Sequence, residues 1–80
     1  MLRPMTETRN FVPPEIWMLH LFSSKAAREG GIVRRKVRDV ERTVGRDMFL
    51  SEIRRRGYRA VENGGQIIVF CNNDQIKRLV

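Results

Sequence analysis

The apolar positions of the chain fall into separate runs, and each run has the spacing of one kind of element. From residue 13 to residue 29 apolar side chains are dense, with Pro13-Pro14-Glu15 at one end and Gly30-Gly31 at the other. Proline is tolerated in the first turn of a helix, and glycine commonly follows the last turn. The sequence therefore predicts a first helix over about 13–29. Residues 1–12 have little periodicity and are predicted to be a flexible arm before a single domain, 13–80.

The first half of this helix, residues 16–22, is apolar nearly all the way round. One buried stripe would leave some of these side chains in water. Either the domain covers the helix on two sides, or the surplus forms an interface with a second copy or another protein. The candidate partner-interface residues are Trp17, Met18, Leu21 and Phe22. His20 lies within the same run and is interpreted as a packed, hydrogen-bonded histidine.

Residues 32–44 fit two patterns. As a strand, alternate residues from Val33 to Val37 share one face; as a helix, the valines at 33, 37, 40 and 44 step by four, three and four. The β-branched pair Ile32-Val33 directly after two glycines favours a short strand. We therefore expect a strand first and then a helix from about Val37 to Val44.

Gly45 divides what would otherwise be one long helix over 37–57. A glycine inside a helix costs about 1 kcal/mol relative to alanine, and Asp47, two residues further on, offers a new N-cap. The pattern favours two helices with a tight turn between them, and one unbroken helix is the alternative. The second helix, Met48–Arg56, has one apolar face, three arginines in its last turn and Gly57 as its stop.

A β-hairpin follows this helix. The segments 58–62 and 66–70 are strand-like, and Asn63-Gly64-Gly65 between them can adopt positive φ cheaply. At the C-terminus, Asn72-Asn73-Asp74 either ends a strand or caps a short last helix, 75–80. A third short strand is the alternative there. The predicted fold class is α+β, in the order helix, strand, helix, helix, hairpin.

Charge adds a functional hypothesis to this fold. Sixteen Lys and Arg residues against nine Asp and Glu give a net charge of +7, while 41% hydrophobic content suffices for a folded domain. Residues 34–59 hold ten of the cations and four anions, which is nearly the whole excess. Almost all of these cations are arginine, whose planar fork suits phosphate. Nucleic acid is the leading expected partner, ahead of an acidic protein surface and of a face that is merely solvated.

Little in the chain suggests catalysis or a cofactor. One cysteine, Cys71, excludes a disulfide framework and a thiolate metal cluster. One histidine and one cysteine make a nucleophilic couple only if the fold brings them together, and no phosphate-binding glycine loop is present. We expect no enzyme, no metal and no cofactor. No window is apolar enough to span a membrane and no signal peptide is recognisable, so a cytoplasmic protein is expected.

The element order over about 14–71 resembles that of winged helix-turn-helix domains. In this comparison Val37–Val44 is the supporting helix, Met48–Arg56 the recognition helix, and 58–70 the wing. The resemblance implies a recognition helix in the major groove and a wing against the DNA backbone, and so a small regulatory DNA-binding module. It makes Arg46, Ser51, Arg54 and Arg55 the DNA-facing candidates. It makes Arg34, Arg35, Lys36 and Arg59 the phosphate-contact candidates.

The segment 49–70 also resembles small toxin ribonucleases of the HicA type. That family uses a histidine on a strand of its sheet, and residues 58–71 of this chain contain none, so ribonuclease activity is a minor alternative. RNA binding without cleavage is a third hypothesis, with Tyr58 and Phe70 as candidate stacking residues. A protein-interaction domain that uses the first helix is the second.

Overall fold

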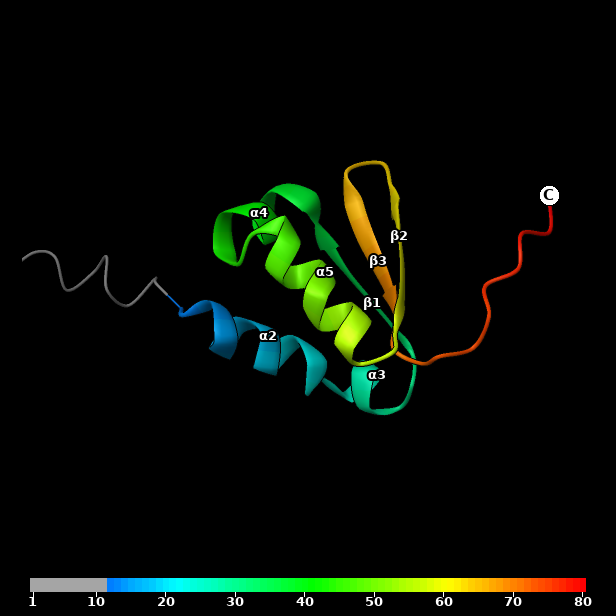
Figure 1. Ribbon diagram of the computed structural model, residues 1–80, viewed down its shortest axis with the longest axis horizontal. Coiled ribbons are helices and arrows are strands. Elements are labelled where there is room, and N and C mark those ends of the chain that lie inside the picture. The colour runs from blue at the N-terminus through cyan, green and yellow to red at the C-terminus, as the bar shows by residue number, and fades with distance from the viewer. Residues whose placement is uncertain (1–11) are drawn as a thin grey trace, which may run out of the picture.

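The protein is a mixed α+β domain, described here for residues 12–80 by a computed structural model. The elements are α2 (Pro14–Phe22), α3 (Lys25–Arg28), β1 (Ile32–Lys36), α4 (Val37–Thr43), α5 (Arg46–Arg55), β2 (Arg59–Asn63) and β3 (Gln66–Phe70). The three strands form an antiparallel sheet in the order β1-β3-β2. The helices gather on one side of this sheet (Figure 1). The predicted fold class is confirmed, and the predicted arm largely lies outside the described residues.

The first helical region is two helices and not one. Ser24 caps α3, because its hydroxyl oxygen accepts a hydrogen bond from the N–H of Ala27 at 3.3 Å. Serine side chains compete with the helix ladder for backbone groups, which favours a cap over a continued helix. The prediction of one helix over 13–29 is therefore wrong at Ser23-Ser24. Gly30 follows α3 with φ +76°, as expected for a helix stop.

The strand and the two following helices agree with the predicted division. β1 ends at Lys36 and α4 starts at the next residue, where the N–H of Val37 donates to the carbonyl of Gly65 in the hairpin turn at 2.8 Å. Gly45 separates α4 from α5 with φ +89° and ψ 146°, a conformation open almost only to glycine. The unbroken helix is thus excluded.

The start of α5 differs from the prediction. Gly45, and not Asp47, is the N-cap, and no side chain caps this end. The carbonyl of Gly45 accepts the N–H of Phe49 at 3.1 Å, so the N-cap lies two residues before the residue expected to cap the helix. Asp47 lies inside the first turn, where its carboxylate still favours the positive end of the helix dipole.

The end of α5 and the hairpin follow the glycine signals. Gly57 has φ +76°, and the N–H groups of Gly57 and Tyr58 donate to the carbonyls of Arg54 and Ile53 at 3.0 Å each. This pair of bonds is a Schellman motif, which satisfies the free carbonyls of the last turn. The hairpin turns at Gly64-Gly65, both with positive φ, which matches the right-handed twist of the strands.

The core lies between the helices and the sheet, with Phe49 of α5 at its centre. Phe49, Val40 and Val69 are almost fully buried. The ring of Phe49 lies 6.1 Å from that of Trp17, edge to face, and 6.2 Å from that of Phe22, stacked. These aromatic contacts attach α2 to α5.

The predicted partner surface on the first helix consists mostly of core residues. Met18, Leu21 and Phe22 are 8%, 3% and 5% exposed, and the partly buried Trp17 packs against the same core. The run 16–22 is apolar on all sides, and this pattern does not show which side the domain itself covers. The apolar side chains of α2 left in water are Ile16 and Leu19, 41% and 52% exposed.

Residues 72–80 form neither the short helix predicted for 75–80 nor the alternative strand. The side-chain oxygen of Asn72 accepts the N–H of Asp74 at 2.9 Å, and the side-chain amide of Asn72 donates to the carbonyl of Gly30 at 3.0 Å. Beyond this anchor Ile76 and Leu79 are 43% and 90% exposed. A helix of so few residues is unstable without an apolar surface to pack on.

Candidate nucleic-acid interface

The exposed face of α5 carries three of the four side chains predicted to face DNA. Phe49 and Ile53 are buried on the inner face of this helix. Ser51, Arg54 and Arg55 are exposed, as the helical period requires for positions on the opposite side. The structure therefore groups these three residues on one surface.

A groove runs between α5 and β2. Its cavity volume is about 310 Å³, and it is lined by Leu50, Ile53, Arg54, Tyr58, Arg59 and Ala60. A second hollow beside it shares Leu50 and Ala60 and continues toward Arg46 and Glu62. Neither Arg54 nor Arg59 has a carboxylate partner within the range 12–80. Arg54 lines the groove from the helix, and Arg59 lines it from the start of the edge strand β2.

Arg46, the fourth DNA-facing candidate, holds the hairpin to the helix. Its guanidinium donates to the carboxylate of Glu62 on β2 at 2.5 Å and lies 3.8 Å from that of Glu41 on α4. The hydrogen bond to Glu62, together with the charge of that carboxylate, raises the pKa of Arg46. Arg46 thus connects three elements, and its charge is matched by acids. That Arg46 faces DNA stays a prediction, and within the described structure its guanidinium braces the hairpin.

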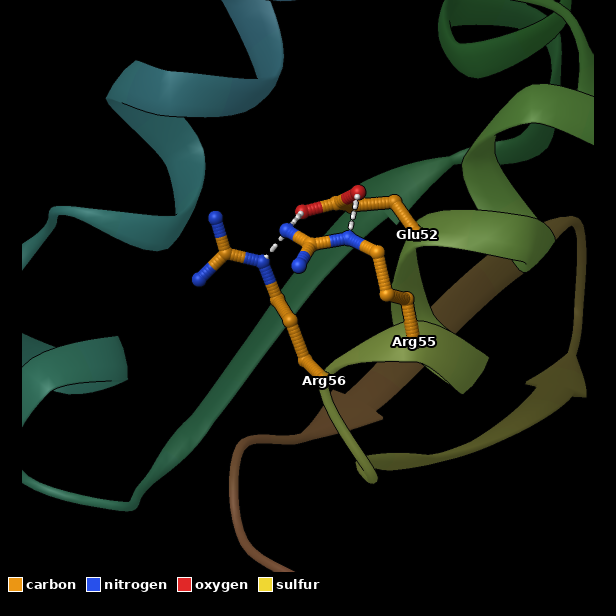
Figure 2. A network of polar contacts seen from close by, with 3 residues as sticks. All are labelled: Glu52, Arg55 and Arg56. Carbon is orange, nitrogen blue, oxygen red and sulfur yellow. Dashed lines mark hydrogen bonds and ion pairs between the residues drawn. The ribbon is translucent and has the colours of Figure 1, made fainter.

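Arg55 is also matched by an acid. Glu52 accepts hydrogen bonds from Nε and Nη2 of Arg55 at 3.0 and 2.7 Å, and from Nε of Arg56 at 2.6 Å (Figure 2). The hydrogen bond from Arg55 is the main cause that lowers the pKa of Glu52 to about 2. Arg55 remains 69% exposed, so one of its faces is still open to a ligand.

Arg56 points from the same cluster toward α2. Its guanidinium carbon lies 4.6 Å from the centre of the Phe22 ring, which is a cation–π contact. The spacings of three and four residues between Glu52 and the two arginines were visible in the sequence. Spacing alone does not distinguish a solvated face from a bound pair, so the sequence did not predict this cluster.

The β1 cations lie apart from the groove. Arg34, Arg35 and Lys36 are exposed on β1, and the central strand β3 separates β1 from β2. Strands are about 4.8 Å apart, so roughly 10 Å separates the backbones of β1 and β2. Nη1 of Arg35 donates to the carbonyl of Arg34 at 2.6 Å. Of the four phosphate candidates, only Arg59 lies beside α5, and the sequence had no means to separate it from the other three.

The two side chains that could form a nucleophilic couple, His20 and Cys71, differ in their exposure to solvent. His20 is exposed on α2, so its interpretation as a packed histidine is wrong: the run 16–22 is apolar on all sides, which does not reveal the open side. Cys71 is buried directly after β3, and burial raises the pKa of its thiol. A raised pKa keeps the thiol protonated and weakens it as a nucleophile. Across residues 12–80 no cluster of three or more His, Cys, Asp or Glu side chains has the arrangement of a metal site.

Comparison with protein families, with curated proteins and with solved structures found no match for this chain. No helix in the described part of the chain is long and apolar enough to cross a membrane.

Proposed function

We propose that the chain is a small regulatory DNA-binding module of the winged-helix type. In this proposal the exposed face of α5 enters the major groove and the β2–β3 hairpin lies against the DNA backbone. A reducing, cytoplasmic setting accords with its single cysteine.

The observation that carries the proposal is the groove between α5 and β2. Arg54 and Arg59 border it from two elements, and neither is neutralised by an acid among the described residues. Arginine binds phosphate through a rigid fork of donors, so Arg54 on the exposed face of α5 and Arg59 at the edge strand can each bind a phosphate of the backbone. The bracing of the hairpin by Arg46 supports the same geometry, because it holds β2 in place relative to α5.

The test is the binding of the full chain to random duplex DNA across a salt series. Log K should fall linearly with log salt, and Arg54→Ala/Arg59→Ala should reduce that slope by about 2, since each phosphate contact contributes about 0.9. The control is Arg28→Ala/Arg78→Ala, which removes the same charge from α3 and the C-terminal segment. Absence of binding at about 50 mM salt, or equal losses in both variants, would contradict the proposal.

RNA binding through the sheet is less well supported. Tyr58, one of its two stacking candidates, has its ring 5.9 Å from that of Phe22 and packs against the core. Phe70, the other candidate, is partly exposed. Competition between duplex DNA and single-stranded RNA for the chain would separate the two functions.

A second candidate function, self-association through α2, has its own observation. Ile16 and Leu19 are exposed three residues apart on the outer face of that helix, and Val12 precedes them at 38% exposed. Glu15 is the only acid or Lys/Arg cation within α2. On a chain of net charge +7, this is a face where two copies can meet without strong repulsion.

A further inference from the structure

The sheet has an outer face, turned away from the helices. Val33, Ile67 and Val69 are buried toward the core. Side chains alternate along a strand, so their neighbours point to the other side. The strand register places nine residues there in three rows: Lys36, Gln66 and Asn63; Arg34, Ile68 and Val61; Ile32, Phe70 and Arg59.

These nine positions combine apolar side chains with positive charge. Four are apolar, three are cations, two are amides and none is an acid. Ile32 and Val61 are 48% and 41% exposed, and Ile68 and Phe70 between them are partly exposed. An apolar centre with a charged rim of one sign is typical of a surface that binds another molecule.

The chemistry of this face decides between occupants. A second copy would place the same three cations against each other. The C-terminal segment of the chain would bring two more cations, Lys77 and Arg78, to this positive face and only one acid, Asp74. Single-stranded nucleic acid needs aromatic platforms for its bases, and three of the four apolar residues are aliphatic. A partner that carries aliphatic side chains with carboxylates beside them matches both the apolar centre and the positive rim of the face.

We propose that the outer face of the sheet docks an acidic amphipathic helix of a partner protein. Aliphatic side chains of that helix cover Ile32, Val61 and Ile68, and its flanking carboxylates meet Arg34, Lys36 and Arg59. The docked helix adds a third layer and covers the face that the chain's own described helices leave open. The site is separate from the exposed face of α5, and only Arg59, at the end of β2, borders both.

The experiment uses a synthetic helical peptide with leucines on one face, spaced three and four residues apart, glutamates beside them and alanine elsewhere. The full-length ¹⁵N-labelled chain is titrated with this peptide. We expect amide shifts concentrated in β1, β2 and β3, and little change in α5. A peptide of the same composition in shuffled order, and one with lysine in place of glutamate, should bind at least about tenfold more weakly.

The variant Ile32→Thr/Val61→Thr keeps β-branched side chains in the strands and removes the apolar surface. It should weaken peptide binding about tenfold or more, while its amide spectrum shows that the fold is retained. The matched control Ile16→Thr/Leu19→Thr removes similar apolar surface from α2 and should leave peptide binding unchanged. Arg54→Ala, which tests the DNA proposal, should also leave it unchanged, so that the two proposals fail separately.

The proposal is overturned if the shuffled peptide binds as tightly, or if the shifts map to the groove between α5 and β2. It is equally overturned if neither threonine variant differs from the native chain. Single-stranded RNA and phosphatidylserine vesicles are titrated in parallel. Stronger shifts from either of these on the outer face would reassign the face to nucleic acid or to an anionic membrane surface.

Discussion

Glu52 shows how one side chain can decide which of several arginines remain available. It is 17% exposed and is hydrogen-bonded to Arg55 and Arg56. A carboxylate that accepts such charge-assisted bonds is stabilised in its ionised form. Arg54, exposed on the same helix, has no such acid partner among the described residues. Under the DNA-binding proposal Arg54 is therefore a better candidate phosphate ligand than Arg55, although the sequence presents the three arginines as equals.

Glu52→Gln should destabilise the fold at pH 7 by about 1–3 kcal/mol. The pKa of Glu52 is lowered from 4.5 to about 2 by folding. Its contribution is therefore complete above pH 4.5 and is lost as the pH falls toward 2. Urea unfolding at several pH values should show the difference from the native chain shrink over that range.

The control for this variant is Glu29→Gln. The carboxylate of Glu29 lies 4.0 Å from Nζ of Lys25, and both side chains are largely exposed. Exposed pairs contribute about 0–1 kcal/mol. Equal losses in the two variants would show that the hydrogen bonds of Glu52 add nothing to stability.

At the level of elements, glycine was the most reliable guide. Gly45, Gly57 and the Gly64-Gly65 pair all end or turn an element where the sequence predicted, because positive φ is a local requirement that few other residues meet. The break at Ser24 was missed, since a serine cap looks the same as a surface serine until the chain around it is placed. The C-terminal helix was predicted from its apolar spacing, which cannot reveal that no surface lies under it.

Gly45→Ala should cost about 1–3 kcal/mol of unfolding free energy, because φ +89° with ψ 146° is strained for any side chain. A Cβ there would meet no atom within 4 Å, so the cost is one of backbone conformation. Gly45→Asn should cost as much as Gly45→Ala, since asparagine tolerates only the left-handed helical region, at much lower ψ. Chemical denaturation measures both. A clear recovery with asparagine would contradict this conformational explanation.

Ser24→Ala tests the cap that the sequence did not reveal. Loss of the bond from the N–H of Ala27 should cost about 1 kcal/mol. Ser24→Asp should retain most of the stability, because aspartate caps as well as serine does. Ser23→Ala, one residue earlier and outside the cap, is the matched control in the same denaturation series. Equal effects at 23 and 24 would show that the hydroxyl is not a cap.

At the scale of the whole molecule, the predicted cations do not form a single surface. The sequence contains one basic segment, 34–59, but the structure places Arg34, Lys36 and Arg59 on the outer face of the sheet, and Arg54 and Arg55 on α5. Arg46 and Glu62 are 16 residues apart and meet only because the hairpin folds back on α5. Such a pair depends on tertiary structure, and periodicity and spacing do not contain it. Fold class was predictable from local signals, whereas the set of available arginines was not.

Self-association through α2, the second candidate function, is tested at this scale. Sedimentation velocity should show a concentration-dependent shift toward a dimer, strengthened by salt, because salt screens the repulsion between two copies of charge +7. Leu19→Asp should abolish the shift, and Val61→Asp, at an exposed apolar position on the sheet, should not. A strict monomer at all protein concentrations would exclude this candidate.

Because Cys71 is buried, the reactivity of the only thiol of the chain reports local opening of the domain. It is 4% exposed, directly after the central strand, and its N–H donates to the carbonyl of Gly31 at 2.8 Å. An alkylating reagent can reach the sulfur only after that junction parts. The rate of alkylation therefore measures how often the junction between Gly31 and Cys71 opens, without any added label.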